Sequence, residues 1–255
     1  MAQFAEVAPF SFSRIETQLE CFASRDSREQ LLQWNLDTSL TVEKFRFTGA
    51  FAANNAGDYD RLVKDFLRSG EVTACLHIQG TPATPLVVES QAISTSVMSM
   101  DFFDRLEQCD VVSSSGSIRA CMEESFDGLP AGDKLRELLL NEDSDNASVF
   151  TPSERLELIF VLFRLLVLGG SMCQPDTTIA RYLAMTKALY RDVLTVYKDA
   201  EGTVAVSGRV YKINAAAGLD LFSHPDKAVA NLLLLLVCPL KKQVVTVKMD
   251  FKPFW

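Results

Sequence analysis

The most apolar stretch of the chain, residues 156–168, restricts the fold more than any other feature. Only Glu157 and Arg164 interrupt its 13 residues. A helix needs about 20 apolar residues to cross a bilayer core, so this run is too short for a membrane span. A helix that is apolar nearly all round must instead be enclosed by protein. We therefore expect it to form the buried centre of a soluble fold.

The residues on either side of this run are typical of the two ends of a helix. Thr151-Pro152-Ser153-Glu154 precedes it, and Gly169-Gly170 follows it. Thr can cap a first turn, Pro is tolerated at the first helical position, and Glu three residues after the cap can bond back to it. Gly supplies the left-handed conformation that ends a helix. The sequence predicts one helix from this capping box to the glycine pair.

Strand patterns dominate the end of the chain. Two pairs of apolar runs are each separated by a short polar turn, which is typical of hairpins. The pairs are 193–197 with 204–213, and 229–237 with 244–251. Apolar and polar residues alternate in the last run, and Lys248 lies on its polar side. This alternation predicts an antiparallel strand with one face in solvent.

Shorter elements fill the rest of the chain, and no period of about 20–50 residues indicates a repeat protein. Strands are expected at 10–13, 42–51, 72–78 and 86–93, and helices after Ser27, Asp58, Ser99 and Pro175-Asp176 and around Leu135. Together the patterns predict an α+β fold. We expect a single compact domain, residues 1–255, with a buried central helix, a mainly antiparallel sheet and C-terminal β-hairpins. A weak subdivision into residues 1–98 and 99–255 is the alternative.

Charge and cysteine usage limit the kinds of partner. The chain has 33 acidic and 25 basic residues and a formal net charge of −8. This balance repels nucleic-acid backbones, and the basic pair Lys241-Lys242 fits a solvated turn. The 6 cysteines form no C-x-x-C pair, and the first residues contain Glu6 and no basic residue, unlike a signal peptide. We expect reduced thiols, a cytoplasmic location, and neither nucleic acid nor membrane as a partner.

No group of residues has the spacing of a catalytic or metal site. His77 and His224 have no further metal ligands near them in the sequence, and Glu123-Glu124 would diverge on a helix. The acidic stretch 141–145 begins like a calcium loop but lacks the Gly and Glu that complete one. Cys173 is the strongest nucleophile candidate, although a buried structural cysteine is the simpler interpretation. We expect no catalytic residue, no metal and no cofactor.

Several short blocks stand in a recognisable order along the chain. They are Leu31-Leu-Gln-Trp34; Phe45-Arg-Phe-Thr-Gly-Ala-Phe51; Ser99-Met-Asp-Phe-Phe-Asp-Arg-Leu106; Leu135-Arg-Glu-Leu-Leu-Leu140 with Glu142-Asp-Ser144; Phe160-Val-Leu-Phe-Arg164 leading into Leu168-Gly-Gly-Ser-Met-Cys-Gln174; and Tyr182-Leu-Ala-Met-Thr-Lys187 with Tyr190-Arg-Asp-Val-Leu194. In order and spacing these blocks resemble the cilia- and flagella-associated protein 300 family, with good coverage from about Gln30 to Tyr197.

This resemblance implies a non-catalytic factor for the assembly of outer and inner dynein arms and their delivery to motile cilia or flagella. It implies a location in the cytoplasm and at the ciliary axoneme. The implied partners are other dynein arm assembly factors, dynein subunits and the intraflagellar transport machinery. The family brings no catalytic residues that could be carried over to this sequence.

A factor with this role needs exposed side chains that can grip a partner, and aromatic residues supply much binding energy at small contacts. Our candidates are Phe251, Phe254 and Trp255 near the end of the chain, followed by Trp34. Burial in the core is the simpler explanation for each. Two other functions remain open: a cysteine-dependent or small-molecule-binding enzyme centred on Cys173, and a stable structural subunit of the axoneme.

Overall fold

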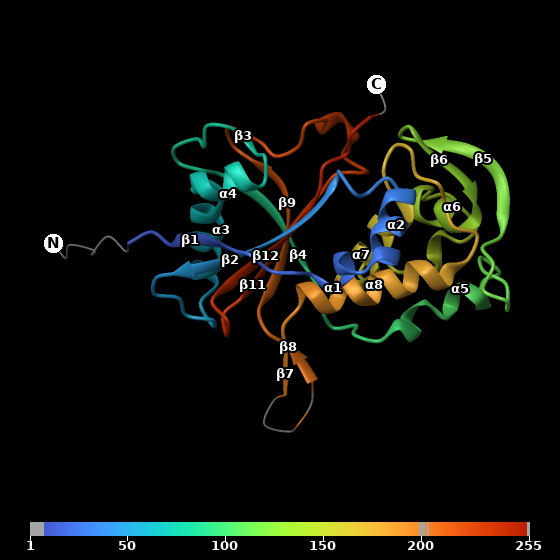
Figure 1. Cartoon of the computed structure of the whole chain (residues 1–255), viewed down its shortest axis with the longest axis horizontal. Helices are drawn as coiled ribbons and strands as arrows, with labels where there is room; N and C mark the ends of the chain where they lie inside the picture. Colours follow the sequence, from blue (N-terminus) through green and yellow to red (C-terminus); the bar gives the residue numbers. More distant parts are fainter. Residues whose placement is uncertain (1–7, 199–201, 203, 254–255) are drawn as a thin grey trace.

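A twisted antiparallel sheet of 8 strands runs through the middle of the protein (Figure 1). The computed structural model describes residues 8–198, 202 and 204–253. Seven of its strands follow one another in the order β1 (Ser11–Ile15), β2 (Leu40–Thr48), β12 (Gln243–Met249), β11 (Leu232–Cys238), β9 (Arg209–Ala216), β10 (Leu219–Asp220) and β3 (Gln79–Gly80). The eighth strand, β4 (Val88–Ile93), pairs with β9 as well. The second strand along the chain, β2, therefore lies beside the last hairpin, which makes the sheet depend on long-range pairing.

Helices cover both faces of this sheet, and each face has its own hydrophobic core. One face carries α3 (Ala56–Arg68) and α4 (Gly70–Cys75). The other carries α7 (Leu158–Leu168) and α8 (Ile179–Val193), with α1 (Glu20–Ala23), α2 (Arg25–Gln33), α5 (Arg105–Gln108) and α6 (Lys134–Leu140) around them (Figure 1). The predicted α+β class and the single compact domain are confirmed.

The buried central helix is confirmed as α7, but it is shorter than predicted. Leu158, Leu162 and Phe163 are among its residues that have lost all contact with solvent. The capping box forms, because the Thr151 N–H donates to Glu154 Oε2 at 2.8 Å and the Glu154 N–H donates to Thr151 Oγ1 at 3.3 Å. It opens only a short 3₁₀ turn, η3 (Glu154–Leu156), and α7 starts afterwards.

Glu157 explains this break between η3 and α7. Its backbone is extended and pairs with Ser94, whose carbonyl accepts the Leu158 N–H at 2.8 Å. The buried Glu157 carboxylate also accepts hydrogen bonds from Ser94 Oγ at 2.6 Å, from the Ser96 N–H at 3.0 Å and from the Val97 N–H at 3.2 Å. Glu157 therefore stops the capping box from continuing into α7 and ties the chain after β4 to the central helix.

Two strand predictions are wrong. Residues 72–78 fold largely as α4, because Val72 and Leu76, one turn apart, are both buried against the sheet. The last strand, β12, is buried on both faces instead of one, because it is central in the sheet and a hydrophobic core covers the sheet on each side. Lys248 is therefore only 3% exposed, and its Nζ donates to the carbonyl of Leu76 at 2.8 Å and pairs with Asp250 at 3.5 Å.

The remaining differences concern caps and hairpins. Ser24 caps α2 in place of Ser27, and Asn55 caps α3 in place of Asp58. Glu123-Glu124 lies on a strand, because β5 (Ala120–Phe126) and β6 (Leu129–Asp133) form a hairpin. Both predicted C-terminal hairpins form, the first as β7 (Val196–Lys198) with β8 (Val204–Val206) and the second as β11 with β12. The centre of the first predicted turn, residues 199–201, lies outside the described residues.

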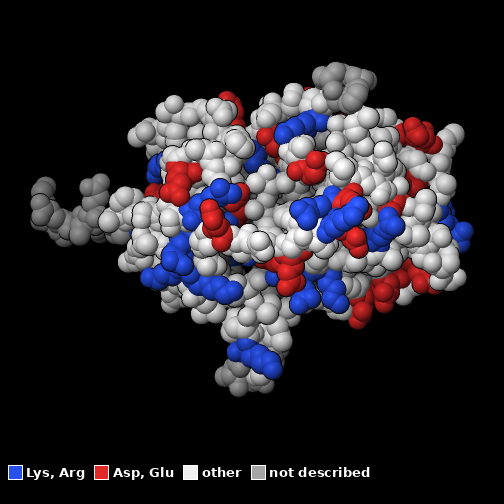
Figure 2. All heavy atoms as spheres, viewed as in Figure 1, with Lys and Arg blue, Asp and Glu red and all other residues white. Residues whose placement is uncertain are grey.

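Two surface properties complete the fold. In the described part of the chain, no helix has the length and apolar character that crossing a membrane requires. Figure 2 shows Lys and Arg side chains mixed with Asp and Glu side chains over the viewed face, which carries α1, α2 and α8. On this face the basic side chains do not gather into one extended patch.

Replacement of Glu157 by Ala should destabilise the protein, because it leaves the Ser96 and Val97 N–H groups without their acceptor. We expect a loss of about 1–3 kcal/mol in the free energy of unfolding, measured by urea titration. The matched control is Glu107→Ala, at an exposed position, which should change stability by less than about 0.5 kcal/mol. Equal effects of the two substitutions would contradict the role assigned to Glu157.

Candidate functional site

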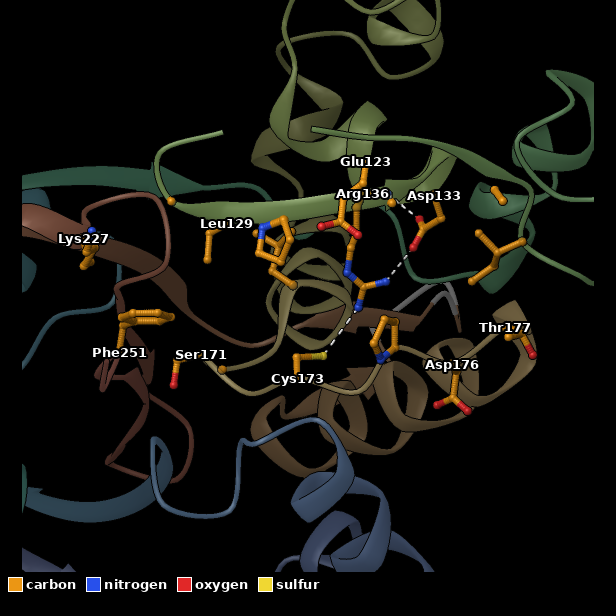
Figure 3. Close-up of a pocket in the computed structure, with 18 of the residues that line it drawn as sticks. Glu123, Leu129, Asp133, Arg136, Ser171, Cys173, Asp176, Thr177, Lys227 and Phe251 are labelled. Atoms are coloured by element: carbon orange, nitrogen blue, oxygen red, sulfur yellow. Dashed lines mark hydrogen bonds and ion pairs between the residues drawn. The ribbon is translucent and has the colours of Figure 1, made fainter. Parts of the chain in front are cut away.

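A cleft of about 640 Å³ lies where α6, the β5–β6 hairpin and the loop after α7 meet (Figure 3). It is the first place to look for a binding or catalytic site, because it combines apolar walls with charged groups. Its floor and walls include Leu129, Asp133, Arg136, Cys173, Asp176 and Phe251. These residues come from three separate regions of the sequence, so the sequence alone gave no sign that they meet.

Arg136 is a buried charged residue that lines this cleft, and it is not among the site residues predicted from the sequence. It is 4% exposed. Its Nη1 donates to Asp133 Oδ2 at 2.8 Å, and its Nη2 donates to the Val167 carbonyl at 2.5 Å and to Tyr182 Oη at 3.2 Å. A buried guanidinium is tolerated when it is paired and hydrogen-bonded in this way. Arg136 therefore joins α6, α7 and α8, and the signal for it is an Asp three residues earlier that also caps α6.

Trp34 packs beneath the same cleft as part of this polar network. Its ring stacks on Tyr182 with 4.6 Å between centroids and 16° between planes. The Trp34 Nε1–H donates to Asp176 Oδ2 at 2.9 Å, and the Asp176 N–H donates to Tyr182 Oη at 3.0 Å. Trp34 is 0% exposed, so it stabilises the loop after α7 and is not available as an exposed contact for a partner.

The glycine pair after α7 brings this loop against the end of α2. The Gly170 N–H donates to the Trp34 carbonyl at 2.9 Å, and the Met172 N–H donates to Asn35 Oδ1 at 3.1 Å. Gly169 has a φ of +64°, and a Cβ on Gly170 would overlap the carbonyl of Asn35. Only glycine therefore permits this contact. Gly169 ends α7 at a positive φ as predicted, but its ψ of −162° is extended and lies outside the left-handed helical region.

Cys173, the nucleophile candidate, lies in the wall of the cleft at 3.5 Å from Arg136 Nη2. Burial raises the pKa of its thiol and outweighs the Arg136 charge, which lowers it. A catalytic thiol needs a lowered pKa so that a thiolate is present at neutral pH. The environment of Cys173 does the opposite, so it fits a packing role better than a nucleophilic one.

The other sequence candidates for chemistry stay apart. Among the residues described by the structure, no three His, Cys, Asp or Glu side chains gather closely enough to hold a metal ion. His77 follows α4, and His224 precedes the short helix η4 (Pro225–Lys227). The acidic stretch 141–145 forms a local turn in which the Asp143 N–H donates to Asn141 Oδ1 at 2.9 Å.

The aromatic residues near the end of the chain divide into two groups. Phe251 is buried at 5% exposure and forms one side of the cleft, where Figure 3 shows its ring near Ser171 and Lys227. Phe254 and Trp255 lie outside the described residues. Phe251 thus packs against the core, and the predicted docking role of Phe254 and Trp255 stays a prediction.

The β7–β8 hairpin is a second candidate surface, and it projects away from the body of the protein (Figure 1). Its two strands form a sheet of their own. Val196, Tyr197 and Val204 are 53%, 43% and 43% exposed. Val196 and Val204 share one face and Tyr197 lies on the other. The sequence predicted the hairpin but gave no sign that it would leave the main sheet with its apolar side chains uncovered.

Comparisons with known proteins identify relatives over nearly the whole chain. The sequence model of the family described as Cilia- and flagella-associated protein 300 matches residues 9–249. A Chlamydomonas reinhardtii protein named Cilia- and flagella-associated protein 300 is 31% identical, over 89% of this chain and 92% of its own length. A Paramecium tetraurelia protein of the same name is 29% identical, over 96% of this chain and 95% of its own length. No solved structure matches.

Replacement of Gly170 by Ala should separate the loop from α2, because the added Cβ would overlap the Asn35 carbonyl. We expect a loss of about 1–3 kcal/mol in the free energy of unfolding, measured by urea titration. Gly70→Ala is the matched control, since a Cβ there meets nothing within 4 Å and the residue begins α4. A control as damaging as Gly170→Ala would show that the Asn35 contact is not the cause.

Thiol labelling should leave Cys173 unmodified in the folded protein at neutral pH. Its raised pKa keeps the thiol protonated, and its burial limits access. Cys109 is exposed and provides the internal reference. Mass spectrometry after a short exposure to iodoacetamide should find Cys109 modified at least about tenfold faster than Cys173. Labelling of Cys173 that is already fast below pH 7 and does not rise further with pH would instead favour a cysteine-dependent enzyme.

Proposed function

Since the chain belongs to the Cilia- and flagella-associated protein 300 family, we propose that it serves the assembly of axonemal dynein arms. In this proposal it acts in the cytoplasm on outer and inner dynein arms and helps to deliver them to motile cilia or flagella. It does so by binding other proteins and not by catalysis. The partners are other assembly factors, dynein subunits and the intraflagellar transport machinery.

The observation that carries a binding role is the exposed β7–β8 hairpin. A two-stranded hairpin alone is at best marginally stable in water, and its strand edges offer unpaired N–H and C=O groups. The hairpin nevertheless carries Val196, Tyr197 and Val204 in solvent. A partner that adds a strand to an edge would pair the free N–H and C=O groups, and a partner that covers the Val196 face would remove the apolar side chains from solvent. We therefore assign the first contact with a partner to this hairpin.

The cleft around Arg136 supports the absence of catalysis in this proposal. The Arg136 cation is fully occupied by protein acceptors, since it pairs with Asp133 and also bonds to Val167 and Tyr182. The thiol beside them has a raised pKa. A general base or nucleophile needs a free side chain whose pKa is tuned toward neutrality. The arrangement in this cleft fits the support of a rigid body that presents the hairpin.

The double variant Val196→Ser/Val204→Ser should weaken partner binding while leaving the fold intact. Both side chains are largely exposed, so we expect a change in Tm of no more than about 2 °C. Affinity purification from ciliating cells should recover several-fold less dynein heavy chain and assembly factor than the wild type does. Val87→Ser is the matched control, because Val87 is 65% exposed but lies away from the hairpin.

Two further outcomes of this purification separate the alternatives. Deletion of Phe254 and Trp255 in a parallel sample tests the end of the chain, and a loss found only there would move the contact from the hairpin to that end. Recovery of the protein with salt-washed axonemes, and not in the soluble fraction, would favour a structural subunit. Full recovery of partners by every variant would remove the assignment to either surface.

A further inference from the structure

A second, smaller cavity of about 240 Å³ lies between α7, the sheet and the loop 228–231. Its α7 wall consists of residues at three- and four-residue spacing: Val161, Arg164, Leu165 and Leu168. Across from them, β9 contributes Lys212 and β4 contributes Gln91, which is paired with Lys212 in the sheet. Arg155, from η3, lies at the rim. The cavity includes no residue of the binding hairpin, and it shares only Leu168 with the cleft around Arg136.

No acidic side chain lines this cavity, although three basic ones do. Arg155, Arg164 and Lys212 take part in none of the ion pairs between described residues. The chain as a whole carries a net charge of −8, so an excess of basic residues does not explain their isolation. Three unpaired cations around one cavity of an acidic protein require a physical reason.

The local energetics show that these charges disturb one another. Burial lowers the pKa of Arg164, and the charge of Arg155 lowers it further. Burial also lowers the pKa of Lys212, with a second contribution from Arg164. Of the three cations, only Arg155 lies near an acidic residue: the charge of Glu142 raises the pKa of Arg155 and so opposes the lowering by burial. Like charges held close together in a partly desolvated site repel, and an anion between them would remove the repulsion.

The hydrogen bonds of the three basic side chains show which of their N–H donors are free to bind an anion. Arg155 is already occupied, because it donates to the carbonyls of Leu138, Ala147 and Phe150. Arg164 donates from Nη1 to the Val229 carbonyl at 3.1 Å, which holds the loop 228–231 on the helix. A guanidinium has five N–H donors, so this bond leaves most of them free for another acceptor. Among the described residues, Arg164 forms no other hydrogen bond with protein and Lys212 Nζ forms none, and both side chains are partly exposed.

A structural role for Arg164 explains its bond to Val229, but it explains neither the lack of an acidic partner nor the nearby charge of Lys212. The bond to Val229 accounts for a single donor, and it could be made without a second cation nearby. Arg136 shows how this protein treats a buried guanidinium that is structural, since Asp133 lies 2.8 Å from it. Arg164 has no such partner among the described residues and faces Lys212 instead.

We propose that this cavity binds an oxyanion of the phosphate class, held by Arg164 and Lys212 with Gln91 at the rim. A guanidinium and an ammonium are the side chains best suited to a multiply charged oxyanion. A volume of about 240 Å³ accommodates phosphate itself or the phosphate group of a small metabolite. Because the anion would bridge α7 and β9, its binding would stabilise the whole fold.

The test measures the effect of inorganic phosphate on the full-length protein. At constant ionic strength, replacing chloride by millimolar phosphate should raise Tm by at least about 2 °C, and calorimetry should detect binding. The double variant Arg164→Met/Lys212→Met should bind phosphate at least about tenfold more weakly. The matched control is Lys241→Met/Lys242→Met, which removes two exposed charges from the β11–β12 turn and should bind as the wild type does.

Glycerol 3-phosphate in a second series distinguishes the source of the anion, since tighter binding than that of phosphate indicates a phosphorylated metabolite. If the double variant fails to fold, Lys212→Met alone, which keeps the Arg164–Val229 bond, should still weaken phosphate binding several-fold. Stabilisation of the wild type that chloride matches would overturn the proposal. Equal phosphate binding by the wild type and a folded variant would overturn it as well.

Discussion

The apolar surface of α7 must be covered on every side, and the arrangement of the other elements follows from this requirement. The sheet covers one side, while Phe103 and Phe150 cover another, at 4.3 Å from Phe163 and 4.9 Å from Phe160 between ring centroids. Burying such side chains stabilises a fold by about 1.5–3 kcal/mol each, which outweighs the constraints that it places on the chain. One of these constraints is the position of Glu157, which must satisfy the backbone at Ser96.

The loop after α7 transmits this arrangement to the rest of the protein. Gly170 contacts the end of α2, and Trp34 from that end stacks on Tyr182 of α8. Arg136 then joins Tyr182 to the carbonyl of Val167. These residues belong to four of the blocks on which the family resemblance rested. The blocks therefore mark a packing centre of the fold.

Two arginines beside α7 have opposite surroundings, although Arg136 is buried and Arg164 is partly exposed. Arg136 has a carboxylate, a carbonyl and a hydroxyl as acceptors. Arg164 has a single carbonyl and lies near other cations. The hairpin β7–β8 contrasts with the rest of the sheet in the same way, because its apolar residues remain in solvent. Both features are local departures from an otherwise satisfied fold, and the two proposed binding sites rest on them.

The sequence by itself determined the local structure of the chain. Apolar periodicity identified α7 and α8, the capping box at Thr151 formed as predicted, and the alternating C-terminal runs became hairpins. These features depend on residues close together in the sequence, whose geometry is fixed by helix and strand periods.

Only the tertiary structure decided which residues distant in the sequence become spatial neighbours. It buried Lys248 by placing the end of α4 over that face of β12, and it turned residues 72–78 largely into α4 by offering Val72 and Leu76 a sheet to pack on. It also brought Arg136 to Tyr182, and Arg164 to Lys212, from distant positions in the chain. Burial and charge pairing are properties of these spatial neighbours, so a linear pattern of residues does not contain them.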